Sequence, residues 1–412
     1  MNVASGEPSG QPAAEAVLTA DERKAGAVAC GTHALHDGYT DIVFVLLPVW
    51  QAEFGLGYAE IGMLRTMFSG TMAGFQIPAG LLAERIGVPA MLAAGTALAG
   101  FGYCVAGLGA SFPMLLLALF IGGLGASVQH PLASALVARA FAGARSRKAL
   151  GTYNFSGDVG KMTLPALAAL LLTLMSWRPA LALLGALGLA AAFAIYIFTP
   201  RYAPLPKAED ATAHASAGAG KAAGFGFPLL LSIGVIDSAA RMAFLTFLPF
   251  VLIAKGASLP SIGLALTLVF AGGAMGKLVC AFIGARIGMF ATVCLTEALT
   301  TIGIVALLPL PLEAAFLLLP LIGIALNGTS SVIYGTVPDL VPPERQARAF
   351  SIFYTGTIGS GALAPAIFGV LGDAIGINAA LVTVAAIVLL TLPLAMALRR
   401  AMATIRPEPA SR

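Results

Sequence analysis

The sequence predicts an all-α membrane protein whose twelve transmembrane helices form two pseudo-symmetric six-helix bundles. Hydrophobic residues make up 58% of the 412-residue chain and charged residues only 10%, far from the charged share of about 25% in soluble domains. Long apolar stretches recur along the whole chain. Asp37 and Pro165 return 200 residues later as Asp237 and Pro365, which indicates two copies of one membrane unit.

Each apolar stretch is long enough to cross a membrane. A helix needs about 20 apolar residues to cross a hydrocarbon core of about 30 Å. Most loops between the stretches are short, so we expect neighbouring helices within a half to pack antiparallel. The twelve expected spans are, in order, residues 26–50, 58–83, 88–109, 112–138, 149–175, 179–199, 228–254, 260–284, 288–310, 313–337, 348–371 and 375–398.

Polar segments divide the chain into five parts. Residues 1–24 are rich in Pro, Gly, Ala and acidic residues and lack the basic-then-apolar order of a cleaved signal, which predicts a disordered cytoplasmic tail. Residues 200–227 have the composition of a linker. We therefore expect this tail, an N-terminal bundle at 25–199, a cytoplasmic linker at 200–227, a C-terminal bundle at 228–398 and a second cytoplasmic tail at 399–412.

The distribution of Lys and Arg predicts the orientation of the chain. If both termini are cytoplasmic, 17 of the 23 Lys and Arg residues lie on the cytoplasmic side, four lie within spans, and only Arg178 and Lys255 lie in outside loops. Cytoplasmic loops of membrane proteins carry this kind of excess. We expect a multi-pass protein of the bacterial inner (plasma) membrane that acts as a monomer in the lipid bilayer.

Motifs of soluble enzymes fail on inspection. Gly160-Lys161-Met162 lacks the leading Gly and the following Ser or Thr of a phosphate-binding loop, and the chain has no His-Glu-x-x-His pattern. The four cysteines lie in apolar segments without a Cys-x-x-Cys pair, as small buried residues do. We expect no enzymatic activity, no cofactor, no metal and no nucleic-acid partner.

Ionisable residues inside the spans are the strongest functional signal. Each costs about 2.5–3.5 kcal/mol at the centre of a membrane helix, so such residues face one another or a wet cavity and mark transport sites. A depth of 1.5 Å per residue places most of them, together with His130, in a layer near the midplane. The nine are Asp37, Asp41, Arg65, Asp158, Lys161, Asp237, Arg241, Lys277 and Glu297.

The first span carries a titratable stripe. His33, Asp37 and Asp41 follow one another at intervals of four residues, with His36 beside His33, so they lie on one helix face. A carboxylate and an imidazole on one polar stripe exchange protons near neutral pH, which is the chemistry of proton coupling. In the alternative interpretation, His33 only hydrogen-bonds Asp37 and fixes the helix against its neighbours.

Two further spans each carry an opposite-charge pair, and a third offers neutral polar groups. Asp158 precedes Lys161 by three residues and Asp237 precedes Arg241 by four. We expect these pairs to contact substrate, or alternatively to bridge each other. Buried cations favour an anionic or zwitterionic substrate, although Lys277 and Arg65 could instead pair with Glu297 or Asp41. The polar candidates in the other half are Asn327 and Tyr334.

One loop resembles a known family signature. Gly80-Leu-Leu-Ala-Glu84-Arg85-Ile-Gly87 is similar to the G-x-x-x-D-R-x-G loop of the major facilitator superfamily, with Glu84 in the place of the usual Asp. The resemblance implies the major facilitator fold, and a gating role at the cytoplasmic side for Gly80, Glu84, Arg85 and Gly87. The second copy keeps Arg-Ile-Gly but has Ala285 at the acidic position.

The N-terminal half resembles a narrower group, the fosmidomycin-resistance family of bacterial efflux proteins. The similar residues are His33-x-x-x-Asp37, Pro48, Glu53-Phe54-x-Leu56 and Gly123-x-Gly125-x-Ser127-Val128-x-His130-Pro131. The resemblance implies drug export by proton antiport, with His33, Asp37 and His130 as the matched positions. The chain departs from that family at Leu132, where the family tends to have an acid, and at Asp158 and Lys161.

Together these observations predict a proton-coupled secondary transporter that exports small polar or anionic compounds, such as drugs or metabolites, by proton antiport. We expect Asp37, His33, His130 and Asp41 to carry protons. Import of an organic anion by proton symport is the alternative, because visible motifs do not fix the direction of flux. A non-transporting membrane sensor is more remote, since the chain has no large soluble domain.

Overall fold

The computed structural model describes residues 18–141, 144–201, 225–342 and 345–405, and all regular structure in these ranges is helical. In the N-terminal half the helices are α1 (Ala20–Phe54), α2 (Tyr58–Ile86), α3 (Val88–Gly107), α4 (Phe112–Ala126), α5 (Gln129–Ala140), α6 (Ala144–Leu174) and α7 (Trp177–Phe198). In the C-terminal half they are α9 (Gly226–Ala254), α10 (Leu259–Ile287), α11 (Met289–Leu307), α12 (Leu312–Leu340), α13 (Gln346–Ile375), α14 (Ile377–Val388) and α15 (Thr391–Ile405).

The prediction of twelve spans is confirmed. α4 and α5 together form one membrane-length segment, Phe112–Ala140, and α14 with α15 forms another, Ile377–Met402. Within the described ranges, ten segments are long and apolar enough by themselves to cross a membrane. The other two spans are α1 and α2, which are longer than a span requires. α1 carries ionisable residues in its middle, and buried Arg65 lies within α2.

The helix boundaries follow local chemistry. Thr19 accepts a hydrogen bond from the Glu22 amide and the Glu22 side chain accepts one from Thr19, so α1 begins with a capping box at Ala20. The backbone hydrogen bond from Thr19 lowers the pKa of the Glu22 carboxyl. Gly87 and Gly288 end α2 and α10 with φ of 88° and 83°, values that favour glycine. These two glycines belong to the repeated Arg-Ile-Gly loops.

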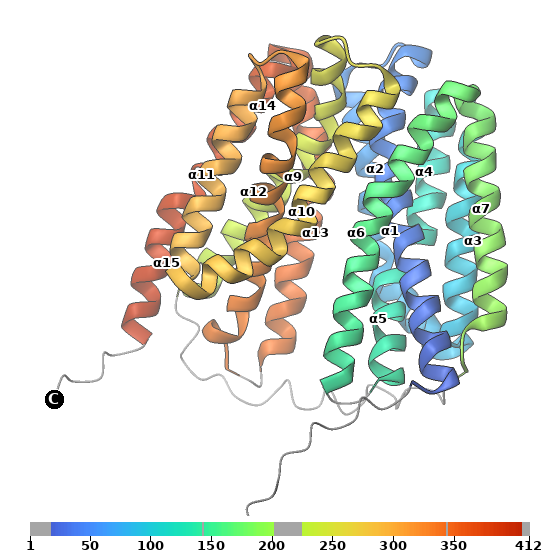
Figure 1. The fold of residues 1–412 in the computed structure, drawn as a ribbon, viewed down its shortest axis with the longest axis horizontal. Coiled ribbons are helices and arrows are strands. Elements are labelled where there is room, and N and C mark those ends of the chain that lie inside the picture. Colours follow the sequence, from blue (N-terminus) through green and yellow to red (C-terminus); the bar gives the residue numbers. More distant parts are fainter. Residues whose placement is uncertain (1–17, 142–143, 202–224, 343–344, 406–412) are drawn as a thin grey trace, which may run out of the picture.

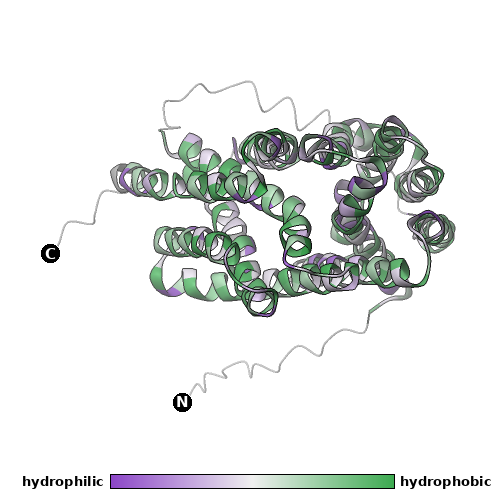
Figure 2. Ribbon diagram, turned by 90° about the horizontal axis from the view of Figure 1, so that it is seen from above, coloured by the Kyte–Doolittle hydropathy of each residue, from purple (hydrophilic) through white to green (hydrophobic). Residues whose placement is uncertain are grey.

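The two halves stand side by side as separate groups of helices (Figure 1). α1 begins, α7 ends, α9 begins and α15 ends at one face of the molecule, which we call the terminal face, and the opposite face is the distal face. The view from above shows both groups dominated by hydrophobic residues (Figure 2). This arrangement is the pair of bundles that the 200-residue repeat predicts.

Packing between the halves is continuous near the distal face. One apolar core includes residues of both halves, such as Phe44, Trp50, Phe247 and Val388. Nearer the terminal face the core separates into one cluster confined to residues 25–195 and another confined to residues 227–402. The halves are therefore sealed together at the distal face and packed independently at the terminal face.

Close contacts at the distal face come from small residues and one cap. A side chain at Gly62 of α2 would overlap the backbone carbonyl of Pro365 in α13, so the two helices touch through their backbones. Asp373 of α13 accepts hydrogen bonds from the amides of Tyr58 and Ala59, at 2.7 and 2.8 Å. It thereby caps the N-terminus of α2 from the other half.

Several boundaries differ from the expected ones. α1 begins at Ala20, so part of the expected 1–24 tail is helical, and α15 continues to Ile405, beyond the expected end at 398. Residues 1–17 of the first tail, 202–224 of the linker and 406–412 of the last tail lie outside the described residues. The helices extend past the apolar stretches because turns at the membrane surface need no apolar residues.

Candidate functional site

Four basic side chains surround one carboxylate in the N-terminal half. Asp37 Oδ1 lies 2.9 Å from His36 Nδ1 and 3.8 Å from His130 Nε2. Asp37 Oδ2 lies 3.2 Å from Lys161 Nζ and 3.4 Å from His33 Nε2. The structure therefore brings together His33, Asp37, His130 and Lys161, which the sequence singled out, and adds His36 as the nearest partner.

Glycines of α6 allow this approach. A side chain at Gly160 would overlap the backbone carbonyl of Ala34 in α1. A Cβ at Gly157 would lie 2.6 Å from Asp37 Oδ2 and 2.7 Å from the His33 ring. Without Cβ atoms at these two positions, α6 packs backbone to backbone on α1 and carries Lys161 to the carboxylate.

The tautomer of His33 is fixed by its neighbour. His33 Nδ1 lies 2.7 Å from the carbonyl oxygen of Tyr153, which can only accept, so Nδ1 carries a proton. In the neutral ring Nε2 then has a lone pair that faces Asp37. The ring also stacks on the Tyr153 side chain at a centroid distance of 4.1 Å. His33 is thus held firmly as a proton acceptor.

His36 faces acceptors with both ring nitrogens. Its Nδ1 lies 2.9 Å from Asp37 Oδ1 and its Nε2 lies 3.0 Å from the Ala126 carbonyl oxygen. A neutral imidazole carries only one N–H, and a carboxylate carries none. Both hydrogen bonds form only when the pair holds one additional proton, either as an imidazolium or as a protonated Asp37. Both side chains are buried.

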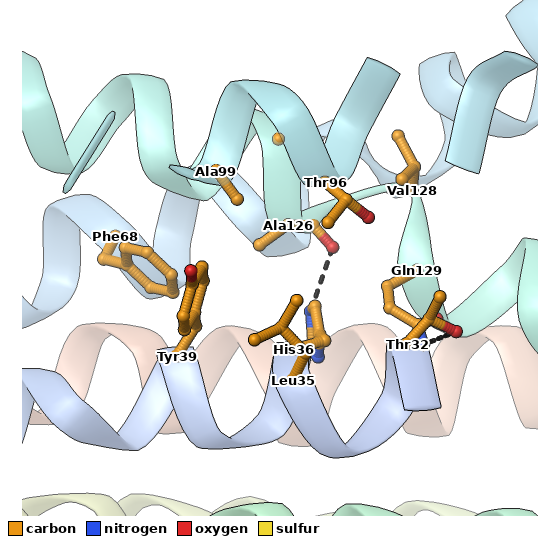
Figure 3. A pocket seen from close by; sticks show the side chains of 11 residues that line it. Thr32, Leu35, His36, Tyr39, Phe68, Thr96, Ala99, Ala126, Val128 and Gln129 are labelled. Carbon is orange, nitrogen blue, oxygen red and sulfur yellow. Dashed lines mark hydrogen bonds between the residues drawn. The ribbon is translucent and has the colours of Figure 1, made fainter. Parts of the chain in front are cut away.

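A small cavity lies on the far side of His36 (Figure 3). Its volume is about 20 Å³, and its walls include Thr32, Thr96 and Gln129. This is room for a water molecule and far too little for a drug-sized compound. Gln129 Nε2 donates to Thr32 Oγ1 at 3.0 Å, while Gln129 Oε1 is buried without a partner among the described residues.

A second ion pair joins the halves. Lys277 Nζ of α10 lies 2.7 Å from both carboxylate oxygens of Asp158 in α6. The Lys277 side chain is 40% exposed, that of Lys161 33% and that of His130 44%. Because Lys277 and Asp158 come from different halves, this ion pair lies at the seam between them.

This geometry replaces the predicted pairing within helices. Asp158 contacts Lys277 rather than Lys161, and Lys161 contacts Asp37. The sequence alternative that Arg65 pairs with Asp41 is the observed one, with Nη2 3.7 Å from Oδ1. Arg65 Nη1 also donates to the Thr40 carbonyl at 2.7 Å. Asp41 is therefore a buried structural partner of Arg65 as well as a neighbour of the Asp37 site.

The polar candidates of the C-terminal half lie apart from the Asp37 site. Asp237 of α9 lies in electrostatic range of Arg241 and of the Glu297 carboxyl on α11. Asn327 donates to the Gly323 carbonyl of its own helix at 3.2 Å. Tyr334 packs among aromatic rings of α13, with Phe350 and Tyr354 both at 4.9 Å.

The predicted gating motif lies at the terminal face. Glu84 and Arg85 are exposed at the end of α2, and Gly87 ends the helix. Gly80 has open space around its Cα. Glu84 and Arg85 line a pocket of about 420 Å³ with Arg139, Tyr196 and Arg201. The motif therefore borders the face at which the halves are packed independently.

The Asp37 cluster also has the ligand types of a metal site. Ligand atoms of His33, Asp37 and His130 lie within 4.8 Å of one another. The ammonium of Lys161, 3.2 Å from Asp37 Oδ2, already neutralises this carboxylate and would repel a cation. The arrangement suits proton exchange and anion binding better than metal binding.

Comparison with known proteins identifies the family. The sequence profile described as Major Facilitator Superfamily matches residues 30–229 and again residues 230–412. The chain belongs to the major facilitator superfamily. The two matches correspond to the two helix bundles, and members of this superfamily are transporters, not enzymes.

The chain spans about a quarter to a third of the length of the curated relatives it matches. The chain is 30% identical to the fosmidomycin resistance protein of Escherichia coli (strain K12) over 141 residues, which is 34% of each chain. It is 26% identical over 147 residues to a probable L-galactonate transporter of the same organism, 36% of this chain and 32% of that one. It is 32% identical over 138 residues to the multidrug resistance protein Stp of Mycobacterium tuberculosis (strain ATCC 25618 / H37Rv). This match covers 33% of this chain and 26% of that protein.

Solved structures share the fold over almost the whole chain. A bacterial homologue of the human lysosomal transporter Spinster, inward-facing and occupied, superposes with a TM-score of 0.78 at 16% identity, covering 96% of this chain and all of that one. The nucleoside transporter NupG, solved as a point mutant, gives a TM-score of 0.74 at 13% identity. The match covers 92% of this chain and 99% of that one. The major facilitator fold predicted from sequence is confirmed, and the chain is an integral membrane transporter.

Three contacts of the site carried little sequence signal. His36 stands beside His33 on the same helix. Its contact with Asp37 depends on the orientation of its ring, which the hydrogen bond to the Ala126 carbonyl holds. The partnership of Lys277 with Asp158 spans 119 residues, and that of Glu297 with Asp237 spans two helices. The available signal was the cost of each buried charge, which predicts a partner without naming it.

Proposed function

We propose that this chain exports small polar or anionic compounds in exchange for protons, with Asp37 as the proton-carrying carboxylate. The observation that carries the proposal is the hydrogen-bond pattern of His36 and Asp37, which requires one proton beyond those of a neutral histidine and a carboxylate. Export agrees with the names of two relatives, a fosmidomycin resistance protein and a multidrug resistance protein.

The mechanism follows from competition for Lys161. While Asp37 is ionised, it holds the Lys161 ammonium at 3.2 Å. When the His36 and Asp37 pair carries its proton on the carboxyl, Lys161 loses its counter-charge and becomes free to bind an anion. Lys277 and Asp158, across the seam, undergo the same exchange when a substrate anion displaces the Asp158 carboxylate. For an anion bound to Lys161, binding of substrate and binding of a proton are thereby positively linked, which is the linkage of symport. Antiport requires a polar or zwitterionic substrate that competes with the proton for the Asp37 carboxylate.

The half-buried cations favour an anionic substrate. Lys161 and Lys277 are partly exposed at the seam, and a substrate carboxylate or phosphonate would recover charge-assisted hydrogen bonds there. The relative described as a probable L-galactonate transporter handles an organic anion by its name. Because of this relative, import of an organic anion by proton symport is the second candidate function.

Transport into everted membrane vesicles tests the proposal. With an acidic interior, proton antiport drives labelled fosmidomycin or L-galactonate into the vesicles, while symport drives preloaded substrate out. Asp37→Asn should abolish the pH-driven flux while the protein stays folded. Glu313→Gln is the matched control, because Glu313 is an exposed acid at the start of α12. Unchanged flux in Asp37→Asn would remove this carboxylate from the mechanism.

A second variant tests the substrate class. Lys161→Ala should reduce uptake of L-galactonate at least about tenfold, because a decade corresponds to about 1.4 kcal/mol of binding free energy. Uptake of a neutral compound carried by the same protein should change much less. Equal losses for both compounds would mean that Lys161 serves the structure of the site and not the recognition of an anion.

A further inference from the structure

The C-terminal half contains two buried carboxyl groups in contact. Asp237 of α9 is 5% exposed and Glu297 of α11 is 1% exposed. The two carboxyls lie close enough to interact, and Thr329 of α12 lies beside Glu297. The Thr329 hydroxyl itself donates to Thr296 Oγ1 at 2.6 Å. The proposed mechanism at Asp37 uses neither carboxyl.

A hydrogen bond between the two carboxyls requires a proton. Two ionised carboxylates have no hydrogen to donate, so a hydrogen bond between them forms only when one of them is protonated. Two like charges at such a distance, away from water, also repel strongly. Two buried, ionised carboxylates side by side are therefore disfavoured, and the pair Asp237–Glu297 favours the state that holds one proton.

The surroundings supply too little positive charge to replace that proton. Within the part of the chain that the structure describes, no Lys, Arg or His forms a salt bridge with either carboxyl, whereas Asp37 has four basic neighbours. Arg241, one turn after Asp237, acts on the pair from a longer range. The thiol of Cys294 is the other titratable group near Glu297, and α12 contributes only the neutral hydroxyl of Thr329.

The unpaired oxygen of Glu297 also supports a protonated carboxyl. Glu297 Oε1 is buried and has no hydrogen-bond partner among the described residues. An ionised carboxylate with an unsatisfied buried oxygen is costly, while the carbonyl oxygen of a neutral acid tolerates this environment better. Burial, the orphaned oxygen and the carboxyl contact agree on a neutral Glu297 sharing its proton with Asp237.

We propose that Asp237 and Glu297 form a second proton-binding site, separate from the Asp37 cluster, so that each half of the transporter carries its own exchangeable proton. Asp237 stands 200 residues after Asp37, at the equivalent position of the repeat. The two copies hold their proton with different partners: a histidine of the same helix in the first half, and a glutamate of a neighbouring helix in the second.

Arg241 gives this site a way to change its state. Arg241 is half-buried and lies one turn from Asp237. A movement that brings its guanidinium against the pair would stabilise two carboxylates and release the proton, as an opposite charge favours the ionised form. As a contribution to transport this step rests on the proposed function, but the proton site itself does not.

Infrared spectroscopy of the purified full-length chain tests the site without any substrate. The reference is Asp37→Asn, because this change removes the carboxyl of the first site. At neutral pH this variant should show the C=O band of a buried protonated carboxyl. Adding Glu297→Gln or, separately, Asp237→Asn should abolish the band, and adding Glu313→Gln should leave it intact.

Thermal unfolding provides a second readout beside the infrared band. Gln has the shape of a neutral Glu, so Glu297→Gln should keep the wild-type Tm near neutral pH. At alkaline pH the wild type should lose Tm as the shared proton leaves, and Glu297→Gln should lose less. A band that is absent from the reference, or that persists in both variants, would overturn the proposal. Failure of pH-driven flux in the vesicle assay with the band present would instead disprove only the proton coupling.

Discussion

The three histidines around Asp37 differ in what their hydrogen bonds permit. His33 donates to the Tyr153 carbonyl and offers its other nitrogen to Asp37. His36 is held between two acceptors and needs a shared proton. His130 is 3.8 Å from Asp37 and partly exposed. His36 and His33 are both buried, and His130 is the partly exposed member of the three.

His36→Gln separates proton storage from packing. The Gln amide can still donate to the Ala126 carbonyl, but it has no basic nitrogen that shares the proton of Asp37. We expect pH-driven uptake of fosmidomycin into everted vesicles to fall by about tenfold or more, a loss of about 1.4 kcal/mol. Exchange of labelled for unlabelled fosmidomycin without a pH gradient should continue.

The control for this variant lies on the opposite wall of the cavity. Thr96→Val removes a hydroxyl that donates only to the Leu92 carbonyl of its own helix, so both kinds of flux should stay near the wild-type level. Equal loss of driven uptake and of exchange in His36→Gln would show that His36 supports folding of the site and does not store its proton.

The sequence identified the residues of the site but not how they pair. The cost of buried charge identified Asp37, Asp158, Lys161 and Lys277 without any structure. Spacing within one helix then suggested Asp158 with Lys161, but their actual partners come from other helices. Which cation meets which carboxylate depends on the rotation and close approach of α6, and no pattern within a single helix contains that information.

At the scale of elements, two glycines decide how α6 meets α1. Gly160→Ala should destabilise the protein, because its Cβ would overlap the Ala34 carbonyl and overpacking of this kind costs about 1–3 kcal/mol. Gly151 lies in the same helix with open space around it. Gly151→Ala should therefore be neutral or stabilising by up to about 1 kcal/mol, through helix propensity.

Thermal unfolding of both variants in the same detergent measures this difference. The Tm should fall for Gly160→Ala and stay level or rise for Gly151→Ala. A Tm of Gly160→Ala equal to that of the wild type would mean that α1 and α6 can separate at no cost. In that case the close approach would not be what fixes the geometry around Asp37.

Helix continuity shows where the sequence patterns succeed and where they fail. Apolar length identified each span, yet the expected span 112–138 is divided between α4 and α5 at Ser127 and Val128. Pro131 has no N–H to bond the carbonyl of Ser127, so the break falls one turn before it. The same happens near Leu389, ahead of Pro393. Hydropathy counts apolar residues and does not register these missing hydrogen bonds.

The molecule as a whole is packed unevenly along its length. A single apolar core crosses from one half to the other near the distal face, while the terminal face has a separate core in each half. Asp373 caps α2 across the distal seam. Closing the terminal face requires the halves to rotate about the seam and to give up these distal contacts, which is the rocking expected of a duplicated transporter.

The charge on Asp37 should control this rotation. Asp37→Asn has no proton to exchange at this position, so we expect it to stay in the conformation described here, with the distal face sealed. In the wild type, added fosmidomycin should shorten the distance between the terminal ends of α6 and α10 and lengthen the distance between their distal ends.

Pulsed electron paramagnetic resonance measures both distances, with spin labels on unnatural amino acids so that the native cysteines stay unlabelled. Exposed positions serve each face: Lys148 and Arg286 at the terminal ends, Leu174 and Pro260 at the distal ends. In Asp37→Asn neither distance should respond to fosmidomycin, while Glu313→Gln should behave as the wild type. If both distances in Asp37→Asn change with fosmidomycin as they do in the wild type, the proton on Asp37 does not govern the exchange between the two faces. The coupling then lies elsewhere in the bundles.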